Sequence, residues 1–205
     1  MKLRTASLPA AVGLLVSLPL HAAVFDVEIS PSKDALNLGS STYTQDHALG
    51  LGAANETAQP ASAASGGEIG GGLTYDDVTN VLSFEFAYGS DFGFNDLLGN
   101  WTLTHLHAPG PVNFPAMNGS GGVIHDLAGF HTPGSSTKTG SFDGSVVLTP
   151  TQEQDLFDNE IYINIHSSDF GAGEIRGQLV VVPEPSTSML ALGAAGLLLV
   201  RRRRA

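Results

Sequence analysis

Hydrophobic and polar residues alternate in short segments along the middle of the chain. A period of two is the pattern of a strand with one buried face. The clearest case covers residues 24–29, where Phe25, Val27 and Ile29 alternate with Val24, Asp26 and Glu28. The other predicted strands cover residues 73–75, 81–88, 101–107, 122–127, 140–148, 161–166 and 174–182. The pattern therefore predicts an all-β domain of short strands.

Turn-forming residues separate these strands. Asp and Asn residues at 76–80 predict a hairpin between two of them. Residues 55–72 are rich in Ala, Ser and Gly and predict a flexible loop that leads into a strand. Residues 149–152 read Thr-Pro-Thr-Gln, which resembles a capped helix start, so we expect a short helix as far as about residue 157. Short strands with one small helix favour an antiparallel Greek-key β-sandwich.

The N-terminal residues 1–23 have the three parts of a secretion signal. Lys2 and Arg4 are basic, residues 8–20 are mostly apolar, and Ala22 and Ala23 are small. We therefore predict a signal helix that is cleaved near Ala22 or Ala23. A short buried helix is the alternative, but the prolines and the glycine within the run disfavour it.

The C-terminal residues 183–205 combine three features of a membrane tail. They begin with the motif Pro183, Glu184 and Pro185 and continue into an apolar stretch. A helix over residues 186–200 would be roughly 22 Å long, which is short for a span, so snorkelling arginines and a locally thinner bilayer would have to compensate. The chain then ends in a basic cluster of Arg201, Arg202, Arg203 and Arg204. These arginines would stop transfer and stay in the cytoplasm, with the β domain outside.

This combination of motif, short apolar helix and arginine cluster resembles the PEP-CTERM sorting tail of Gram-negative bacteria. The resemblance implies that exosortase, a membrane protease-transpeptidase, recognises and removes the tail, and that the protein accompanies exopolysaccharide production. It also implies a precursor tethered in the inner membrane and a product at the cell surface or outside the cell. Pro183 and Pro185 favour the extended backbone that a protease needs. A simple C-terminal anchor is the alternative.

Charge is distributed unevenly between the ends and the middle of the chain. The whole chain has a formal net charge of -11 and no cysteine. Between the two ends, only Lys33, Lys138 and Arg176 are basic, against nineteen acidic residues, which gives the domain a net charge of -16. Such a surface disfavours nucleic acid as a partner. Without disulfides, the stability of the domain must come from its core or from a bound ion.

Three fragments carry a second resemblance. Residues 104–110 read THLHAPG, residues 161–166 read IYINIH, and residues 173–179 read GEIRGQL. Together they resemble the CHRD domain, which is named from chordin and is widespread in exported bacterial proteins. The similarity runs from about residue 47 to residue 180. We therefore divide the chain into a signal peptide (1–23), an N-terminal extension with a strand (24–46), a CHRD-like β domain (47–182) and a sorting tail (183–205).

Histidines in two of these fragments are candidate metal ligands. His105 and His107 share a strand face because they are two residues apart. If residues 161–166 form a neighbouring strand, His166 can join them, and three imidazoles suit copper or zinc. The arrangement resembles the copper ligands of Cu/Zn superoxide dismutase. His125 and His131 are further candidates. The alternative is that all these histidines simply hydrogen-bond to nearby polar groups.

Glu174 and Arg176 also share a strand face. We expect them to form a buried structural pair that ties two strands together, and a ligand clamp is the alternative. The chain has no nucleophile-elbow sequence and no phosphate-binding loop. The sequence therefore predicts no enzyme.

Two hypotheses for the function remain, a binding or structural protein and a metalloprotein. The first is an exported, exosortase-processed protein of the envelope or extracellular matrix, with a non-catalytic CHRD domain that binds or supports exopolysaccharide or other matrix. The second is a metalloprotein with copper or zinc at His105, His107 and His166, either a metal store or an enzyme that handles superoxide. A carbohydrate-binding module is a third hypothesis, but Tyr88 and Trp101 are too few for an aromatic platform.

Overall fold

The computed structural model describes residues 23–29, 50–56, 60–109 and 121–182. The predicted signal helix up to Ala22, the motif at Pro183 to Pro185, the membrane helix and the terminal arginines lie outside the described residues. Within the described ranges, no helix is both long enough and apolar enough to span a bilayer.

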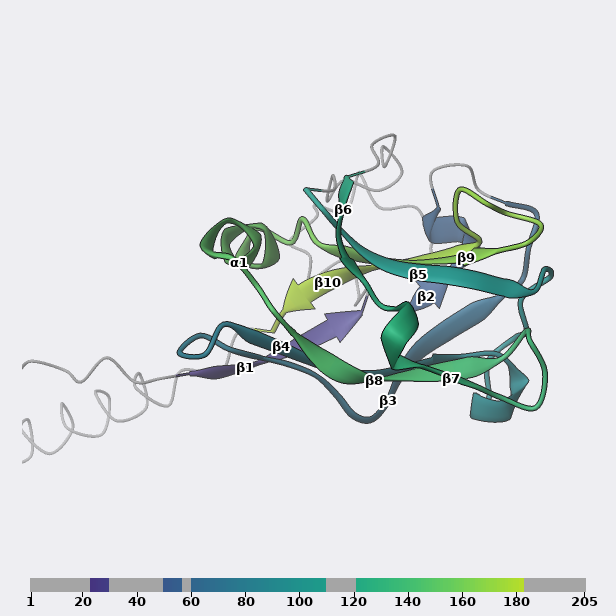
Figure 1. Cartoon of the computed structure of the whole chain (residues 1–205), viewed down its shortest axis with the longest axis horizontal. Coiled ribbons are helices and arrows are strands. Elements are labelled where there is room, and N and C mark those ends of the chain that lie inside the picture. Colours follow the sequence, from purple (N-terminus) through teal and green to yellow (C-terminus); the bar gives the residue numbers. More distant parts are fainter. Residues whose placement is uncertain (1–22, 30–49, 57–59, 110–120, 183–205) are drawn as a thin grey trace, which may run out of the picture.

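The described chain forms one antiparallel sheet that is folded into two layers, as Figure 1 shows. The first layer contains three strands: β5 (Trp101–Ala108), β6 (Gly122–Asp126) and β9 (Tyr162–Ser167). The facing layer contains four strands: β3 (Ser65–Asp76), β4 (Val81–Tyr88), β7 (His131–Pro133) and β8 (Gly140–Val147). Connecting the layers are β1 (Val24–Ile29), β2 (Leu51–Gly52) and β10 (Ile175–Val181). The predicted all-β antiparallel class is confirmed.

Neighbours in the sheet are often distant in sequence. The order is β6-β5-β9-β10-β1-β3-β4-β8-β7, with β2 pairing to β10 and β3. Thus β4 pairs with β8, and β5 pairs with β9, although each pair is separated by other strands along the chain. Crossing between layers in this way is typical of Greek-key sandwiches. It brings the second CHRD-like fragment beside the first, and the third beside the second.

The core lies between the two layers, where the alternating residues meet. Leu82, Phe84 and Phe86 of β4 are buried, as the sequence predicts. On the opposite layer Ile163 and Ile165 of β9 are completely buried. Because side chains alternate along a strand, these isoleucines direct the even-numbered residues of β9 to the outer face.

The first predicted strand is an interior strand of the sheet. β1 pairs with β10 on one side and with β3 on the other. Val27 and Ile29 are buried in the core. The sequence-based boundary at residue 46 therefore does not separate this strand from the β domain.

The predicted loop over residues 55–72 is partly wrong, because its second half is strand. Residues 65–72 form the first part of β3, with a bulge between Glu68 and Leu73. At Gly66 an added Cβ would lie 2.4 Å from the carbonyl oxygen of Ala87, so the close pairing of these strands requires glycine. Gly-rich composition here marks tight strand packing, not flexibility.

The predicted helix is present as α1 (Pro150–Phe157). Thr149 caps it: its hydroxyl accepts a hydrogen bond from the backbone N–H of Gln152, and the Gln152 side chain accepts one from the Thr149 N–H. Short 3-10 turns, which the sequence did not predict, occur at Ala53–Asn55, Ser90–Phe92 and Ala128–Phe130.

Candidate metal centre

The outer face of β5, β9 and β10 is polar, yet most of it is buried. Its buried side chains come from even positions of β9 and β10 and odd positions of β5, and they are His107, Tyr162, Asn164, His166, Arg176 and Gln178. Cross-strand pairing explains their proximity, because His105 lies opposite Asn164 and His107 lies opposite Tyr162. Polar groups removed from water need partners, so this face is a candidate site.

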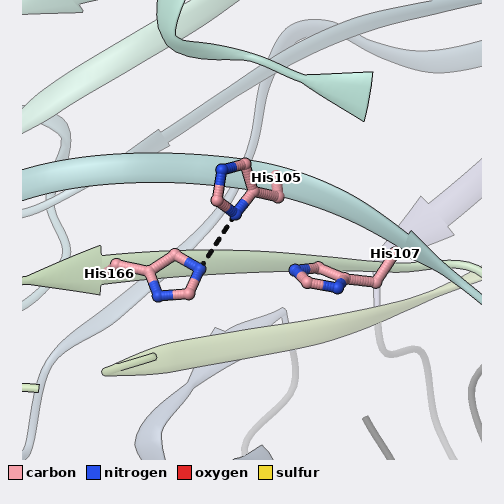
Figure 2. A group of neighbouring side chains, drawn as sticks. All are labelled: His105, His107 and His166. Carbon is pink, nitrogen blue, oxygen red and sulfur yellow. Dashed lines mark hydrogen bonds between the residues drawn. The ribbon is translucent and has the colours of Figure 1, made fainter. Parts of the chain in front are cut away.

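His105, His107 and His166 form a cluster on this face, shown in Figure 2. Each imidazole offers one ring nitrogen, and these three atoms lie within 4.8 Å of one another. The closest approach is 3.1 Å, between Nδ1 of His105 and Nε2 of His166. His107 and His166 are each 8% exposed, whereas His105 is half-buried. The spacing predicted from the His-x-His pattern and a neighbouring strand is therefore present.

Backbone carbonyls determine which nitrogen of two rings carries the proton. His107 Nδ1 lies 2.9 Å from the carbonyl oxygen of Gly121, and His166 Nδ1 lies 3.0 Å from that of Gly171. A carbonyl oxygen can only accept, so both Nδ1 atoms donate. In the neutral rings the lone pair is then on Nε2, and His105 Nδ1 must donate to His166 Nε2.

Burial keeps two of these rings in the neutral form that a metal requires. It lowers the pKa of His107 and of His166, although hydrogen bonds to Gly121 and Gly171 oppose the effect. His107 Nε2 is buried and has no hydrogen-bond partner among the described residues. An unpaired lone pair in a buried site costs free energy unless an ion or another group occupies it.

The donor set fits a borderline transition metal. Three neutral imidazoles suit Cu(II) and Zn(II), and metal-binding histidines usually donate their other N–H to a carbonyl, as His107 and His166 do. Two nitrogens on one tetrahedral zinc ion would be about 3.3 Å apart. His105 and His166 already approach this separation, so a modest movement of His107 would complete a three-histidine site.

Tyr162 and Arg176 lie directly behind His107. The Tyr162 ring stacks on the His107 ring, with centroids 4.9 Å apart and planes 4° from parallel. The Arg176 guanidinium carbon lies 3.4 Å from the centroid of the Tyr162 ring. The sequence pattern does not predict this stack, because it depends on the register of β5, β9 and β10.

Glu174 and Arg176 are both buried, but their contacts differ from the predicted pair. The Glu174 carboxylate accepts hydrogen bonds from the Ser62 hydroxyl and from the backbone N–H groups of Leu98 and Gly99. Arg176 lies over Tyr162. None of these contacts joins the Glu174 carboxylate to the Arg176 guanidinium. Glu174 precedes β10, so the alternation of that strand does not govern its direction.

His125 and His131 lie apart from the cluster. His131 stacks on Trp101 with centroids 3.8 Å apart, and its Nε2 is 3.0 Å from the Tyr88 hydroxyl. His125 is on β6 opposite Leu106, a core residue. The structure thus assigns neither residue to the three-histidine group.

Comparisons with known proteins identify two regions of the chain. A family model described as the CHRD domain matches residues 49–179. A second, described as the PEP-CTERM protein-sorting motif, matches residues 181–204. The comparisons with curated proteins and with solved structures found no match.

Proposed function

Because this chain belongs to the CHRD domain family and ends in a PEP-CTERM motif, we propose that it is a non-catalytic envelope protein whose β domain binds Cu(II) or Zn(II). The sorting motif marks it as an exported protein of a Gram-negative bacterium that exosortase recognises. The metal site consists of His105, His107 and His166.

One observation carries the metal proposal: the unpartnered Nε2 of His107. Only 8% of the His107 surface is exposed. The ligand nitrogens of the three imidazoles lie within 4.8 Å of one another. Its own Nδ1–H is held by Gly121, so the ring cannot satisfy Nε2 by changing tautomer without losing that bond. A metal ion would use this lone pair and would also replace the His105–His166 hydrogen bond.

The contacts of the cluster support binding without catalysis. Hydrolysis or proton-coupled redox chemistry at a metal needs a group that transfers protons beside it. Among the described residues, the hydrogen bonds of the three imidazoles go to one another and to backbone carbonyls. The two matched regions are a non-catalytic domain and a sorting signal.

The proposed route to the envelope begins with a precursor tethered in the inner membrane by residues 186–200. Exosortase then removes the tail, and the domain reaches the cell surface or the surrounding matrix. There its net charge of -16 favours metal cations over polyanions and keeps it soluble beside exopolysaccharide. A bound ion would also replace the disulfides that this exported chain lacks.

Metal titration tests the proposal directly. Protein without a histidine tag is titrated with Cu(II) and with Zn(II) by calorimetry, beside His105→Ala, His166→Ala and the control His125→Ala. We expect one ion per wild-type domain, affinity at least tenfold lower in the first two variants, and wild-type affinity in the control.

Equal stoichiometry and affinity in all four proteins would exclude the site. A superoxide dismutation assay of the copper-loaded protein tests the absence of catalysis. Activity in wild type that is lost in His166→Ala would overturn that part of the proposal and favour a superoxide-handling enzyme.

A further inference from the structure

We infer that Tyr162 is a positioning residue that presets His107 for metal binding; this inference rests on the metal site proposed above. It acts through two independent contacts, one with the imidazole ring itself and one with the backbone group that holds the ring. Tyr162 does not itself touch the ion.

The first contact is the ring stack. The Tyr162 and His107 rings are nearly parallel, 4° apart, at a centroid distance of 4.9 Å. They are register partners on neighbouring strands, so backbone pairing places them side by side. The stack restricts rotation of the imidazole, which keeps Nε2 directed toward the other two histidines.

The second contact passes through Gly121. Its backbone N–H donates to the Tyr162 hydroxyl at 3.0 Å, and its carbonyl oxygen accepts from His107 Nδ1 at 2.9 Å. An added Cβ at this position would lie 2.4 Å from the carbonyl oxygen of Pro109, so the chain approaches too closely for any other residue. The Tyr162 hydroxyl thereby holds the carbonyl that selects the His107 tautomer.

Arg176 supports Tyr162 from the opposite ring face. Its guanidinium carbon is 3.4 Å from the ring centroid, and the residue is 1% exposed. A buried guanidinium on an aromatic face is a strong cation–π contact. The tyrosine ring therefore contacts both the Arg176 guanidinium and the His107 imidazole, which restricts its rotation.

Such support lowers the cost of binding. A ring already in the correct tautomer and orientation loses little conformational freedom when the ion binds. Groups that orient metal ligands typically change metal affinity 10- to 100-fold when they are removed. We expect removal of the Tyr162 hydroxyl to have an effect at the lower end of this range, because the ring stack remains.

The test compares Tyr162→Phe with Tyr88→Phe. Both delete one buried hydroxyl that lies beside a histidine, but Tyr88 contacts His131, outside the cluster. Zn(II) and Cu(II) affinities are measured by competition with a chelator, and long-range ¹H–¹⁵N spectra of the metal-free proteins report the tautomer of each histidine. We expect about tenfold weaker binding and a mixed His107 tautomer in Tyr162→Phe alone.

Unchanged affinity together with an unchanged His107 tautomer in Tyr162→Phe would overturn the inference. An equal loss in Tyr88→Phe would also overturn it, since the effect would then be general destabilisation. If wild type binds no metal, the proposed function fails, whereas the tautomer spectra still decide whether Tyr162 positions His107.

Discussion

The histidines of this domain have different neighbours on the outer and inner faces of the sheet. His105 and His107 point outward and meet His166, whereas His131 contacts Trp101 and Tyr88. Burial lowers the pKa of His131, so the folded protein favours its neutral ring. The single tryptophan of the chain, Trp101, stacks on this ring, so we expect its emission to respond to protonation of His131.

Acid conditions should destabilise the protein through His131. Below about pH 6.5 the unfolded chain takes up a proton on His131 before the folded chain does, so stability falls as pH falls toward the lowered pKa. Protonation in the folded state should quench Trp101 emission, because the imidazolium stacks on the indole at 3.8 Å. We expect a fluorescence decrease with a midpoint below pH 6.5.

The matched variants are His131→Gln and His125→Gln. Fluorescence excited at 295 nm should lose its pH dependence in the first and keep it in the second, because His125 is on β6 away from the indole. A midpoint above 6.5, or a transition that survives in His131→Gln, would contradict the assignment.

Glycines explain two positions of the family-like fragment GEIRGQL. Gly173 has φ of +131°, and an added Cβ would lie 2.3 Å from the Asn164 side chain. At Gly177 an added Cβ would lie 2.3 Å from Ile29. The fragment thus combines the close packing of β10 against β1 and β9 with a buried arginine behind the histidine cluster.

Among the elements, β9 connects the core with the candidate site. Its odd residues fill the core, and its even residues carry Tyr162, Asn164 and His166. The pairing of β5 with β9 is irregular between Trp101 and Leu103, and Trp101 stacks on His131 and not on the histidine cluster.

The capped start of α1 contributes to the stability of the domain. Thr149→Ala removes the cap of α1, which should lower the free energy of unfolding by about 1 kcal/mol and Tm by roughly 2–4 °C. The control is Thr151→Ala, an exposed position inside the first turn, where alanine is the better helix former. Thermal unfolding of both variants measures the difference, and an equal loss of stability in both would show that the cap is not responsible.

At the scale of the whole molecule, the sheet and the sorting tail are directly connected. β10 ends at Val181, and the backbone N–H of Val182 still donates to the carbonyl oxygen of Asp26 on β1. The family match to the sorting motif begins at residue 181. The paired backbone is a poor protease substrate, so processing should remove only residues after Val182.

Mass spectrometry of protein from the native host measures this outcome. We expect a C-terminus near Pro183 to Pro185, and an intact tail when exosortase is absent from the host. Mature protein that retains Arg201 to Arg204 would favour a permanent anchor. Cleavage before Val182 would contradict the protection by β1.

The sequence alone determined most of the strands, the capped helix and the shared face of His105 and His107, because alternation and capping depend on neighbours only a few residues apart. The family similarity and the sorting tail were also evident from local motifs. The pairing of β5 with β9, the separate partners of Glu174 and Arg176, and the strand character of residues 65–72 depended on tertiary structure. These features arise where segments distant in the chain pack together, and a local pattern contains no information about which segments will meet.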